Sequence, residues 1–340
     1  MKDLGAELHH FPPTLMNDSG GSLLCFPNLN TSCRRLQQPR SESALFHTLL
    51  TLISLLTVML NLLIIISIAH FRQLHTPTNV LLLSLAVVDL LVGLLVMPIE
   101  GLRHLETCWL LGRLMCAVTP YVSYCLISAS LSHMVLISVD RYVAICDPLL
   151  YPTRFTLTNV KICVCLCWLC YIFYNGLILM EHMARPDRFN SCHGECVVII
   201  SRVSGTVDLF VTFVAPCTVM VVLYFRVFLA AVSQMRLIYS QKAVKTSRTV
   251  KKSEWKAART LGIVIFVYVT CFCPYYYPSF AGVDLSSSLS YFAALSWILM
   301  LNSCMNPLIY ALFYPWFRKS IRFIFTLKIL QPNSREVKIL

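Results

Sequence analysis

The stretch VSGTVDLFVTFVAPCTVMVVLYFRVFLAAV, residues 203–232, is apolar for long enough to cross a lipid bilayer. An α-helix needs ~20 residues to span a hydrocarbon core of ~30 Å, and this stretch exceeds that length. Because a backbone in lipid must satisfy its own hydrogen bonds, and because the period-two alternation of a barrel is absent, we expect helices. We place seven such runs along the chain, at 45–70, 79–99, 115–139, 160–180, 204–232, 260–282 and 288–313.

The composition agrees with a membrane protein. Of the 340 residues, 57% are hydrophobic and only 13% are charged, whereas a soluble domain carries about 25% charge. The predicted fold class is an all-α membrane protein, a seven-transmembrane helix bundle with a short amphipathic eighth helix. We divide the chain into an N-terminal segment (1–44), the helix bundle (45–313) and a tail (314–340). Aromatic and aliphatic residues alternate with basic ones at the start of the tail, which is typical of an interfacial helix: Trp316, Phe317, Phe323, Ile324 and Phe325.

The distribution of Lys and Arg predicts the orientation. Both are abundant in the loop at 233–259 and in the tail, and the loop between the sixth and seventh runs has neither. By the positive-inside rule the basic loop and tail are cytoplasmic, and the N-terminus is extracellular. Asn17 and Asn30 begin N-glycosylation sequons on that outer side. The net charge of +12 mostly reflects this asymmetry, so we expect a lipid bilayer and not a nucleic acid as partner.

The sixteen cysteines predict a few disulfides rather than a dense framework. A bridge from Cys116 to either Cys192 or Cys196 would hold the second outer loop across the bundle, and the other cysteine of that pair would bind the N-terminal segment. The residues alone leave this pairing open. Six cysteines lie at outer positions where oxidation is permitted: Cys25, Cys33, Cys108, Cys116, Cys192 and Cys196.

Asp208 is the residue that most strongly indicates a function. A carboxylate within a membrane helix costs roughly 2.5–3.5 kcal/mol on insertion scales and usually faces a partner inside the bundle. The neighbouring runs offer no Lys or Arg at a similar depth, so we expect the cation to arrive as a ligand. The alternative is a structural or protonated acid that hydrogen-bonds to Thr212, one turn below.

A second buried carboxylate, Asp89, predicts a hard-cation site. Oxygen ligands suit a sodium ion, by analogy with other hard cations. The alternative is a structural water cluster, and we expect no other cofactor. The oxygens proposed for the sodium site belong to Asp89, Ser130, Asn302 and Ser303.

The third run closes on Asp140-Arg141-Tyr142, which predicts a conformational switch. Asp140 can neutralise Arg141 locally, and Glu254, at the inner start of the sixth run, is a second partner for the arginine. A pair that links helices three and six and then breaks is a bistable element. The alternative is two unrelated interfacial charges.

Together these residues resemble the landmarks of rhodopsin-like G-protein-coupled receptors, one set in each span and in the right order. Further stretches resemble the trace amine-associated receptors: 75–79, 151–153, 256–262 and 302–317. The landmarks are Asn61, Asp89, Asp140-Arg141-Tyr142, Trp168, Pro216 with Tyr224, Pro274, and Asn306-Pro307 with Tyr310.

The resemblance implies a function and several partners. Most members of that family are olfactory receptors for volatile amines, coupled to the stimulatory, cyclase-activating G protein, in the plasma membrane of sensory neurons. The family's disulfides correspond here to Cys116–Cys196 and Cys33–Cys192. Tyr224 and Tyr310 would stabilise the opened cytoplasmic cleft of the active state.

Departures from the family pattern point to a relocated amine site. Ser123 stands where aminergic receptors carry a helix-three aspartate, and Met300 stands where a tyrosine often surrounds that anchor. Asp208 matches a subset of the family that carries its acid on helix five instead. We expect aromatic walls from Phe272, Tyr275, Tyr276 and Trp297, for each of which plain bundle core is the alternative.

The predicted function is a chemosensory receptor for cationic amines with Asp208 as counter-ion. The main alternative is a seven-helix receptor for a neutral ligand, in which Asp208 only accepts a hydrogen bond. The sequence shows neither the internal repeat of a transporter nor the nucleophile–base pattern of an enzyme. Four acids nearer the cavity mouth either bind a second amino group or are solvated loop charges: Glu100, Glu181, Glu195 and Asp284.

Overall fold

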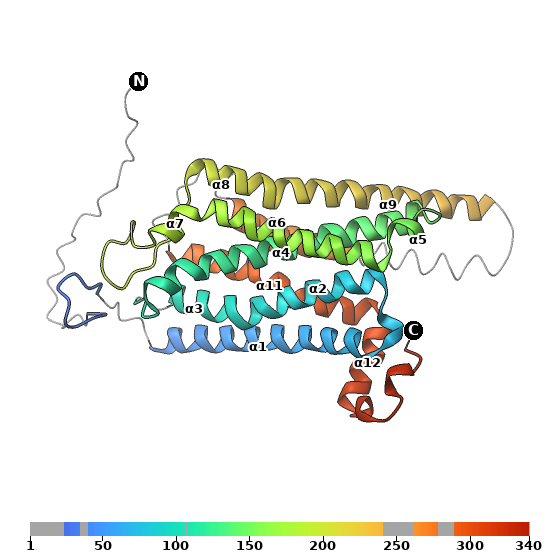
Figure 1. Cartoon of the computed structure of the whole chain (residues 1–340), viewed down its shortest axis with the longest axis horizontal. Helices are drawn as coiled ribbons and strands as arrows, with labels where there is room; N and C mark the ends of the chain where they lie inside the picture. Colours follow the sequence, from blue (N-terminus) through green and yellow to red (C-terminus); the bar gives the residue numbers. More distant parts are fainter. Residues whose placement is uncertain (1–23, 35–39, 106–107, 241–261, 278–288, 340) are drawn as a thin grey trace, which may run out of the picture.

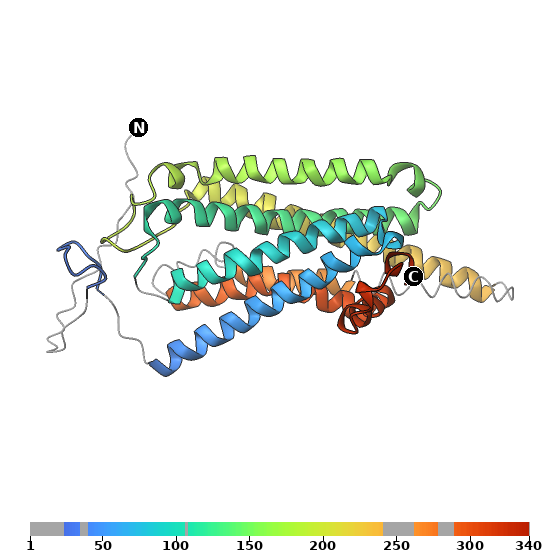
Figure 2. The same cartoon turned by 60° about the horizontal axis from the view of Figure 1, so that its bottom comes forward.

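The computed structural model is a bundle of long helices and describes residues 24–34, 40–105, 108–240, 262–277 and 289–339. In this part of the chain, six helices are long and apolar enough to cross a membrane, and a shorter apolar helix spans Gly262–Tyr277. The helices run roughly along one long axis (Figure 1), and the turned view shows α1 tilted against α4 and α6 (Figure 2). The predicted fold class, a seven-helix membrane bundle followed by an eighth helix, is confirmed.

Two of the spanning helices contain a π-helical turn. The second consists of α2 (Pro77–Leu91), the π segment η2 (Val92–Val96) and α3 (Met97–Leu105), and the fifth consists of α8 (Arg202–Asp208), the π segment η3 (Leu209–Val214) and α9 (Ala215–Ser240). The remaining long helices are α1 (Arg40–His70), α4 (Gly112–Cys146), α6 (Leu157–Ile178) and α11 (Leu289–Phe313). Shorter pieces are η1 (Arg72–Leu74), α5 (Tyr151–Arg154), α7 (Met180–Ala184), α12 (Pro315–Phe325), η4 (Lys328–Leu330) and η5 (Ser334–Glu336).

Side-chain caps fix where three of these helices begin. Thr76 accepts a hydrogen bond from the backbone N–H of Asn79 at the start of α2, where Pro77 occupies the first helical position. Thr156 caps α6 in the same way. Ser201 accepts from the N–H of Ser204 at 3.1 Å and so sets the start of α8, the segment that ends at Asp208.

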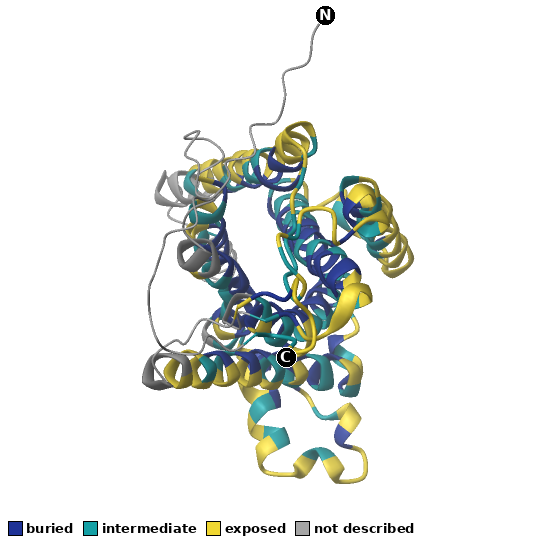
Figure 3. Cartoon of the chain, turned by 90° about the vertical axis from the view of Figure 1, so that its left-hand side faces the viewer, coloured by how far each residue is buried: buried dark blue, intermediate teal, exposed yellow. Residues whose placement is uncertain are grey.

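Apolar side chains occupy both the inside and the outside of the bundle. Seen end on, the helices form a ring whose inward faces are buried and whose outward faces are exposed (Figure 3). Large apolar residues such as Phe173, Val203 and Phe266 are 70%, 76% and 70% exposed. An outward band of this kind is the surface that a bilayer covers, because a soluble protein rarely exposes so much apolar area.

One end of the bundle carries a cross-linked cap, made of residues 24–34, the turn at 108–111 and the long loop 185–201. Main-chain hydrogen bonds join its parts: His193 N–H donates to Thr31 O at 2.8 Å, and Trp109 N–H donates to Gly194 O at 2.7 Å. Gly194 has φ of +103°, a conformation that other residues rarely adopt. Its hydrogen atom also leaves room for the ring of Phe26, which a Cβ would meet at 3.0 Å.

Three disulfides hold this cap together. Cys33–Cys192 and Cys116–Cys196 are the two pairings that the family resemblance implies. A third bridge, Cys25–Cys108, joins the N-terminal segment to the turn after α3 and was not predicted. The cap therefore fastens the N-terminal segment to both neighbouring loops.

At the opposite end, α12 is a separate helix after α11, as the tail sequence predicts. Its first aromatic residues, Trp316 and Phe317, are 6% and 0% exposed, so they pack against the bundle rather than face a membrane surface. Phe325 is 72% exposed at the end of the helix. The chain then turns back, and the side chain of Ser334 lies 3.0 Å from His70 Nε2 on α1.

Candidate binding cavity

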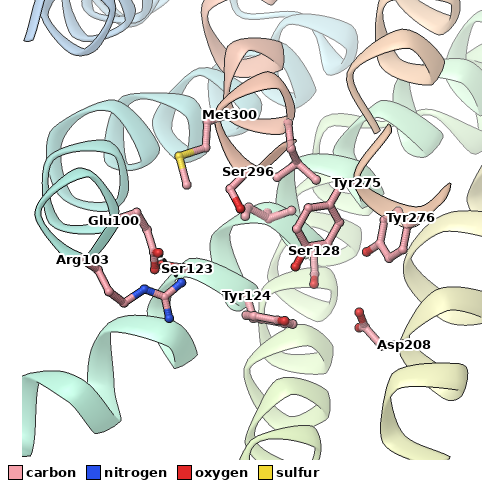
Figure 4. Close-up of a pocket in the computed structure, with 12 residues that line it drawn as sticks. Glu100, Arg103, Ser123, Tyr124, Ser128, Asp208, Tyr275, Tyr276, Ser296 and Met300 are labelled. Carbon is pink, nitrogen blue, oxygen red and sulfur yellow. Dashed lines mark hydrogen bonds and ion pairs between the residues drawn. The ribbon is translucent and has the colours of Figure 1, made fainter. Parts of the chain in front are cut away.

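A cavity opens between the spanning helices, with about 500 Å³ of empty space that includes its opening to solvent. Its charged residues lie at two ends: Asp208 on α8, and the pair Glu100 and Arg103 on α3 (Figure 4). Aromatic and small polar side chains line the space between them (Figure 4). The full lining is Glu100, Arg103, Ser123, Tyr124, Ile127, Ser128, Asp208, Tyr275, Tyr276, Ser296, Leu299 and Met300.

Asp208 is 6% exposed and faces this cavity. The hydroxyl of Tyr174 on α6 donates to its Oδ1 at 3.3 Å. Within the described ranges no Lys, Arg or His forms an ion pair with Asp208. The carboxylate therefore has hydrogen-bonding support in its buried position, but no cation from the part of the protein that the structure describes.

Thr212 lies behind Asp208 rather than in the cavity lining. Its hydroxyl donates to the main-chain oxygen of Asp208 at 2.5 Å and lies 2.8 Å from the hydroxyl of Tyr276. The hydroxyls of Thr212 and Tyr276 also hydrogen-bond to the Asp208 carboxyl, so the contact that the alternative considered above requires is present. The contact between the Thr212 and Tyr276 hydroxyls connects the fifth helix with the helix Gly262–Tyr277 beside the carboxylate.

The other end of the cavity holds an ion pair. Glu100 Oε2 lies 2.6 Å from Arg103 Nη2, and the two side chains are 5% and 19% exposed. The hydroxyl of Ser123 on α4 lies 3.2 Å from Glu100 Oε1 and 2.9 Å from the main-chain oxygen of Thr119. Where the family pattern has a helix-three aspartate, this chain has a serine that contacts a glutamate from the second helix.

Of the two interpretations offered for Glu100, a solvated loop charge is wrong. Its burial and its contacts place it in the cavity wall, where Arg103 compensates its charge. Glu181 forms an exposed ion pair with Arg188, and the Glu195 carboxylate accepts from the backbone N–H of Ser191 at 2.7 Å, so both are loop charges. Asp284 lies outside the described residues.

Five predicted ligand-binding residues line the cavity: Asp208, Ser123, Tyr275, Tyr276 and Met300. Phe272 and Trp297 do not line it. Phe272 is 2% exposed, and its ring centroid lies 4.5 Å from that of Tyr268 in the core. Trp297 packs against a second core cluster that includes Val88 and Val92.

The predicted residue set omitted two lining residues that helical spacing would have found. Ile127 lies four residues after Ser123, and Ser296 lies four residues before Met300. Residues four apart share one face of a helix, so both were within reach of a predicted neighbour, whereas Tyr124 and Ser128 do not follow from this spacing. Tyr174 gave no comparable signal, because its contact with Asp208 depends on how two distant helices pack.

Asp89 lies deeper in the bundle and is fully buried. Ser130 donates to its Oδ1 at 3.1 Å, and Asn306 Nδ2 donates to its Oδ2 at 2.8 Å. Ser303, on α11, also hydrogen-bonds to this carboxylate. The amide oxygens of Asn302 and Asn306 are buried and accept no hydrogen bond within the described part of the chain. The local donor set is thus rich in oxygen, as a sodium site requires.

At the end of α4, the Asp140 carboxylate is fully buried and multiply hydrogen-bonded. Tyr151 donates to its Oδ1 and Thr78 to its Oδ2, each at 2.9 Å. Arg141 forms an ion pair with Asp140 and also contacts Thr78. Glu254, the other predicted partner of Arg141, lies outside the described residues.

The remaining predicted switch residues occupy packed positions around this end of the bundle. Tyr142 packs beside Ile145 and Val227, which links α4 to the fifth helix. Tyr224 packs so closely on Gly262 that a Cβ there would lie 2.5 Å from the tyrosine hydroxyl. Asn306, Pro307 and Tyr310 are all buried on α11.

Comparison with known proteins identifies relatives over almost the whole length. The family model described as 7 transmembrane receptor (rhodopsin family) matches residues 60–310. The chain is 37% identical to trace amine-associated receptor 13c of Danio rerio, with 94% of this chain and 96% of that protein covered. It is 37% identical to trace amine-associated receptor 1 of Mus musculus, over 93% of this chain and 99% of the relative. The Homo sapiens receptor 1 is 35% identical over 93% of this chain and 97% of its own length.

Proposed function

Because the chain belongs to the rhodopsin family of seven-transmembrane receptors and, within it, to the trace amine-associated receptors, we propose that its ligand is a cationic amine bound at Asp208. A member of this family is a multi-pass membrane protein, a receptor and not an enzyme, with a small-molecule ligand and a G protein as partners.

One observation carries the proposal: Asp208 is a buried carboxylate in the cavity wall that has no cationic partner in the described part of the chain. An ammonium group in the cavity supplies the charge that the helices do not. Tyr124, Tyr275 and Tyr276 surround the space between Asp208 and the far end. Their rings add cation–π attraction and apolar contact for the ligand.

Replacing Asp208 by Asn tests this role. The amide keeps the shape of the side chain but removes its charge. Removing one member of a buried ion pair costs about 3–5 kcal/mol, which corresponds to a loss of amine affinity of roughly a hundredfold or more. The measurement is a concentration–response curve for amine-evoked cyclic AMP, with surface expression quantified in the same cells. Asp208→Glu, which retains the charge, is the matched control and should keep a measurable response.

The same assay separates the charged-ligand receptor from a receptor for a neutral ligand. Each amine is compared with the alcohol of the same carbon skeleton. A neutral-ligand receptor would respond to the alcohols and would keep that response in Asp208→Asn. Unchanged amine potency in well-expressed Asp208→Asn would overturn the assignment.

Signalling follows from a shift between two states of the bundle, because a ligand favours the state that it binds more tightly. Asp208 adjoins the contact between Thr212 and Tyr276, which joins the fifth helix to the helix Gly262–Tyr277. In the proposed mechanism the amine draws the fifth helix inward, the sixth helix moves about Pro274, and Arg141 parts from Glu254. Tyr224 and Tyr310 then stabilise the open cytoplasmic cleft.

The proposal extends to the setting of the receptor. We place it in the plasma membrane of sensory neurons, with an olfactory role and with a stimulatory G protein on the cytoplasmic side. The cap lies outside the cell in this orientation, so Asn30, which is exposed, is available for glycosylation. Asn17 lies outside the described residues.

We also propose that a sodium ion binds beside Asp89. Ser130 and Ser303 supply neighbouring oxygens, the buried Asn302 oxygen that accepts no hydrogen bond among the described residues is the third proposed ligand, and the carboxylate supplies the charge that a hard cation requires. The ion would neutralise Asp89 in its fully buried position and hold α2, α4 and α11 together.

A further inference from the structure

The two ends of the cavity differ in charge balance, and this difference bears on which amine the receptor accepts. Among the described residues, the lining contains two carboxylates, Asp208 and Glu100, and one guanidinium, Arg103, which gives this part of the lining a net charge of −1. Only the Glu100 carboxylate has its cation already in place. One ammonium group neutralises the cavity, whereas two would leave a buried positive charge.

We infer that Arg103 is a specificity-determining residue that makes the cavity select a single ammonium group at Asp208 with an uncharged, polar far end, and that it excludes diamines. This inference rests on the proposed function and deepens it. Both members of the Glu100–Arg103 pair lie on α3, three residues apart, so their contact does not require another helix to move. The pair therefore presents a preformed neutral wall to the far end of the ligand (Figure 4).

Ser123 supports this assignment. Its hydroxyl lies 3.2 Å from Glu100 Oε1, so the two residues share one site between α3 and α4. An aspartate at 123 would bring a second carboxylate against Glu100, and two like charges at that distance resist ionising together. The loss of the helix-three acid and the presence of Glu100 thus belong to one arrangement, in which Arg103 sets the net charge.

The rest of the far end is polar but uncharged. Ser123 and Ser296 line the cavity with hydroxyls, Met300 adds an apolar contact, and Ser128 lies between the two ends, near Tyr275 (Figure 4). Hydroxyl groups and an ion pair can hydrogen-bond a ligand alcohol or ether, since they offer both donors and acceptors. A second ammonium group would meet the guanidinium of Arg103, and like-charge juxtaposition is strongly unfavourable in a desolvated site.

The test uses the full-length receptor in cell membranes and a set of straight-chain amines over a range of lengths. Within each length, the far end is a methyl, a hydroxyl or a second amino group. For the wild type, we expect the amino alcohol and monoamine to be more potent than the diamine. In Arg103→Gln, Glu100 loses the guanidinium paired with it, the lining gains one negative charge, and diamine potency relative to monoamine should rise about tenfold or more.

Three matched variants identify the cause. Arg103→Lys keeps the positive charge and should keep the wild-type preference. The double variant Glu100→Gln with Arg103→Gln should lose the gain, because the unmasked carboxylate is gone. Glu100→Gln alone leaves the cation and should be the least responsive to diamines. An unchanged ratio of diamine to monoamine potency in a well-expressed Arg103→Gln receptor overturns the inference, as does a wild type that prefers diamines.

A second comparison keeps the inference testable if Arg103→Gln does not reach the cell surface. Glu100→Gln and the double variant both lack the carboxylate and differ only in the cation at 103, so diamines should be more potent on the double variant. Equal diamine potency on the two overturns the inference. Failure of the proposed function and failure of this inference can be told apart. The Asp208→Asn experiment measures the response to every amine, whereas the variants at 100 and 103 measure the ratio of potency between two amines.

Discussion

At the residue scale, the most informative observation is that two buried carboxylates line one cavity and that, among the described residues, only Glu100 has a cation paired with it. Glu100 has Arg103 one turn along its own helix, whereas Asp208 has the hydroxyls of Tyr174, Thr212 and Tyr276 beside it and no cation within the described structure. Asp208 could be predicted because it is an isolated acid within an apolar run. The sequence did not predict that Glu100 lies in the cavity wall. The second apolar run ends at residue 99, so a charged residue directly after it is expected at the membrane surface.

The sodium proposal belongs to the same scale and is tested by thermal unfolding in detergent. A ligand that binds only the folded state stabilises it by RT ln(1 + [L]/Kd), or about 1 kcal/mol at several times Kd. NaCl should therefore raise the melting temperature of the wild type more than choline chloride at equal ionic strength. Asp89→Asn should remove the difference between the two salts. Equal stabilisation by both salts in the wild type would count against a sodium site.

At the scale of single elements, apolar runs predicted the spanning helices well but not their ends or their internal geometry. The second helix extends from residue 77 to 105 and the fifth from 202 to 240, each beyond its predicted run, because a helix continues past the hydrocarbon core. The π segments η2 and η3 were not predicted. A π turn changes the register of a helix, and it depends on neighbouring helices rather than on local propensity. Each lies within the helix that carries one of the cavity acids.

Two glycine-to-alanine substitutions separate the steric cost of a close helix contact from the gain in stability that comes from lower backbone entropy in the unfolded chain. Gly93 lies in η2, where a Cβ would meet Thr57 Cγ2 on α1 at 2.9 Å. Overpacking costs about 1–3 kcal/mol, which exceeds the gain of about 0.5–1 kcal/mol from replacing a helical glycine by alanine. Gly93→Ala should therefore lower the melting temperature.

Gly176 on α6 provides the control for that substitution. A Cβ at this position has only the ring of Tyr121 nearby, at 3.9 Å. Gly176→Ala should accordingly raise stability by about 0.5–1 kcal/mol, since only the backbone term remains. Melting temperatures that move in the same direction for both substitutions would show that the contact between α1 and η2 is not close enough to matter.

At the scale of the whole molecule, the cap converts separate loops into one cross-linked unit above the bundle. The cysteines at outer positions predicted that disulfides would hold the second outer loop and the N-terminal segment, and the family resemblance implied two of these disulfides. The third, Cys25–Cys108, had no sequence signal beyond two unassigned cysteines, since pairing depends on where the N-terminal segment folds.

Replacing Cys25 and Cys108 together by serine should lower stability by about 2–4 kcal/mol, because the bridge closes a long loop in the unfolded chain. Changing both avoids leaving a reactive thiol. Cys163→Ser, at an exposed free cysteine of α6, is the control and should have little effect. The measurement is thermal unfolding of the purified receptor without reductant. A melting temperature equal to that of the control would mean that this bridge does not support the fold.

Two of these bridges keep the receptor in one covalent piece after a single cut in the loop between α7 and α8. Arg185 and Arg188 are exposed in the loop between α7 and α8, where a trypsin-like protease would sever the backbone. The two resulting fragments would still be joined twice, through Cys33–Cys192 and Cys116–Cys196. In denaturing electrophoresis, a nicked receptor would thus migrate as a single species until its disulfides are reduced. Before reduction, the cap would stay attached over the cavity.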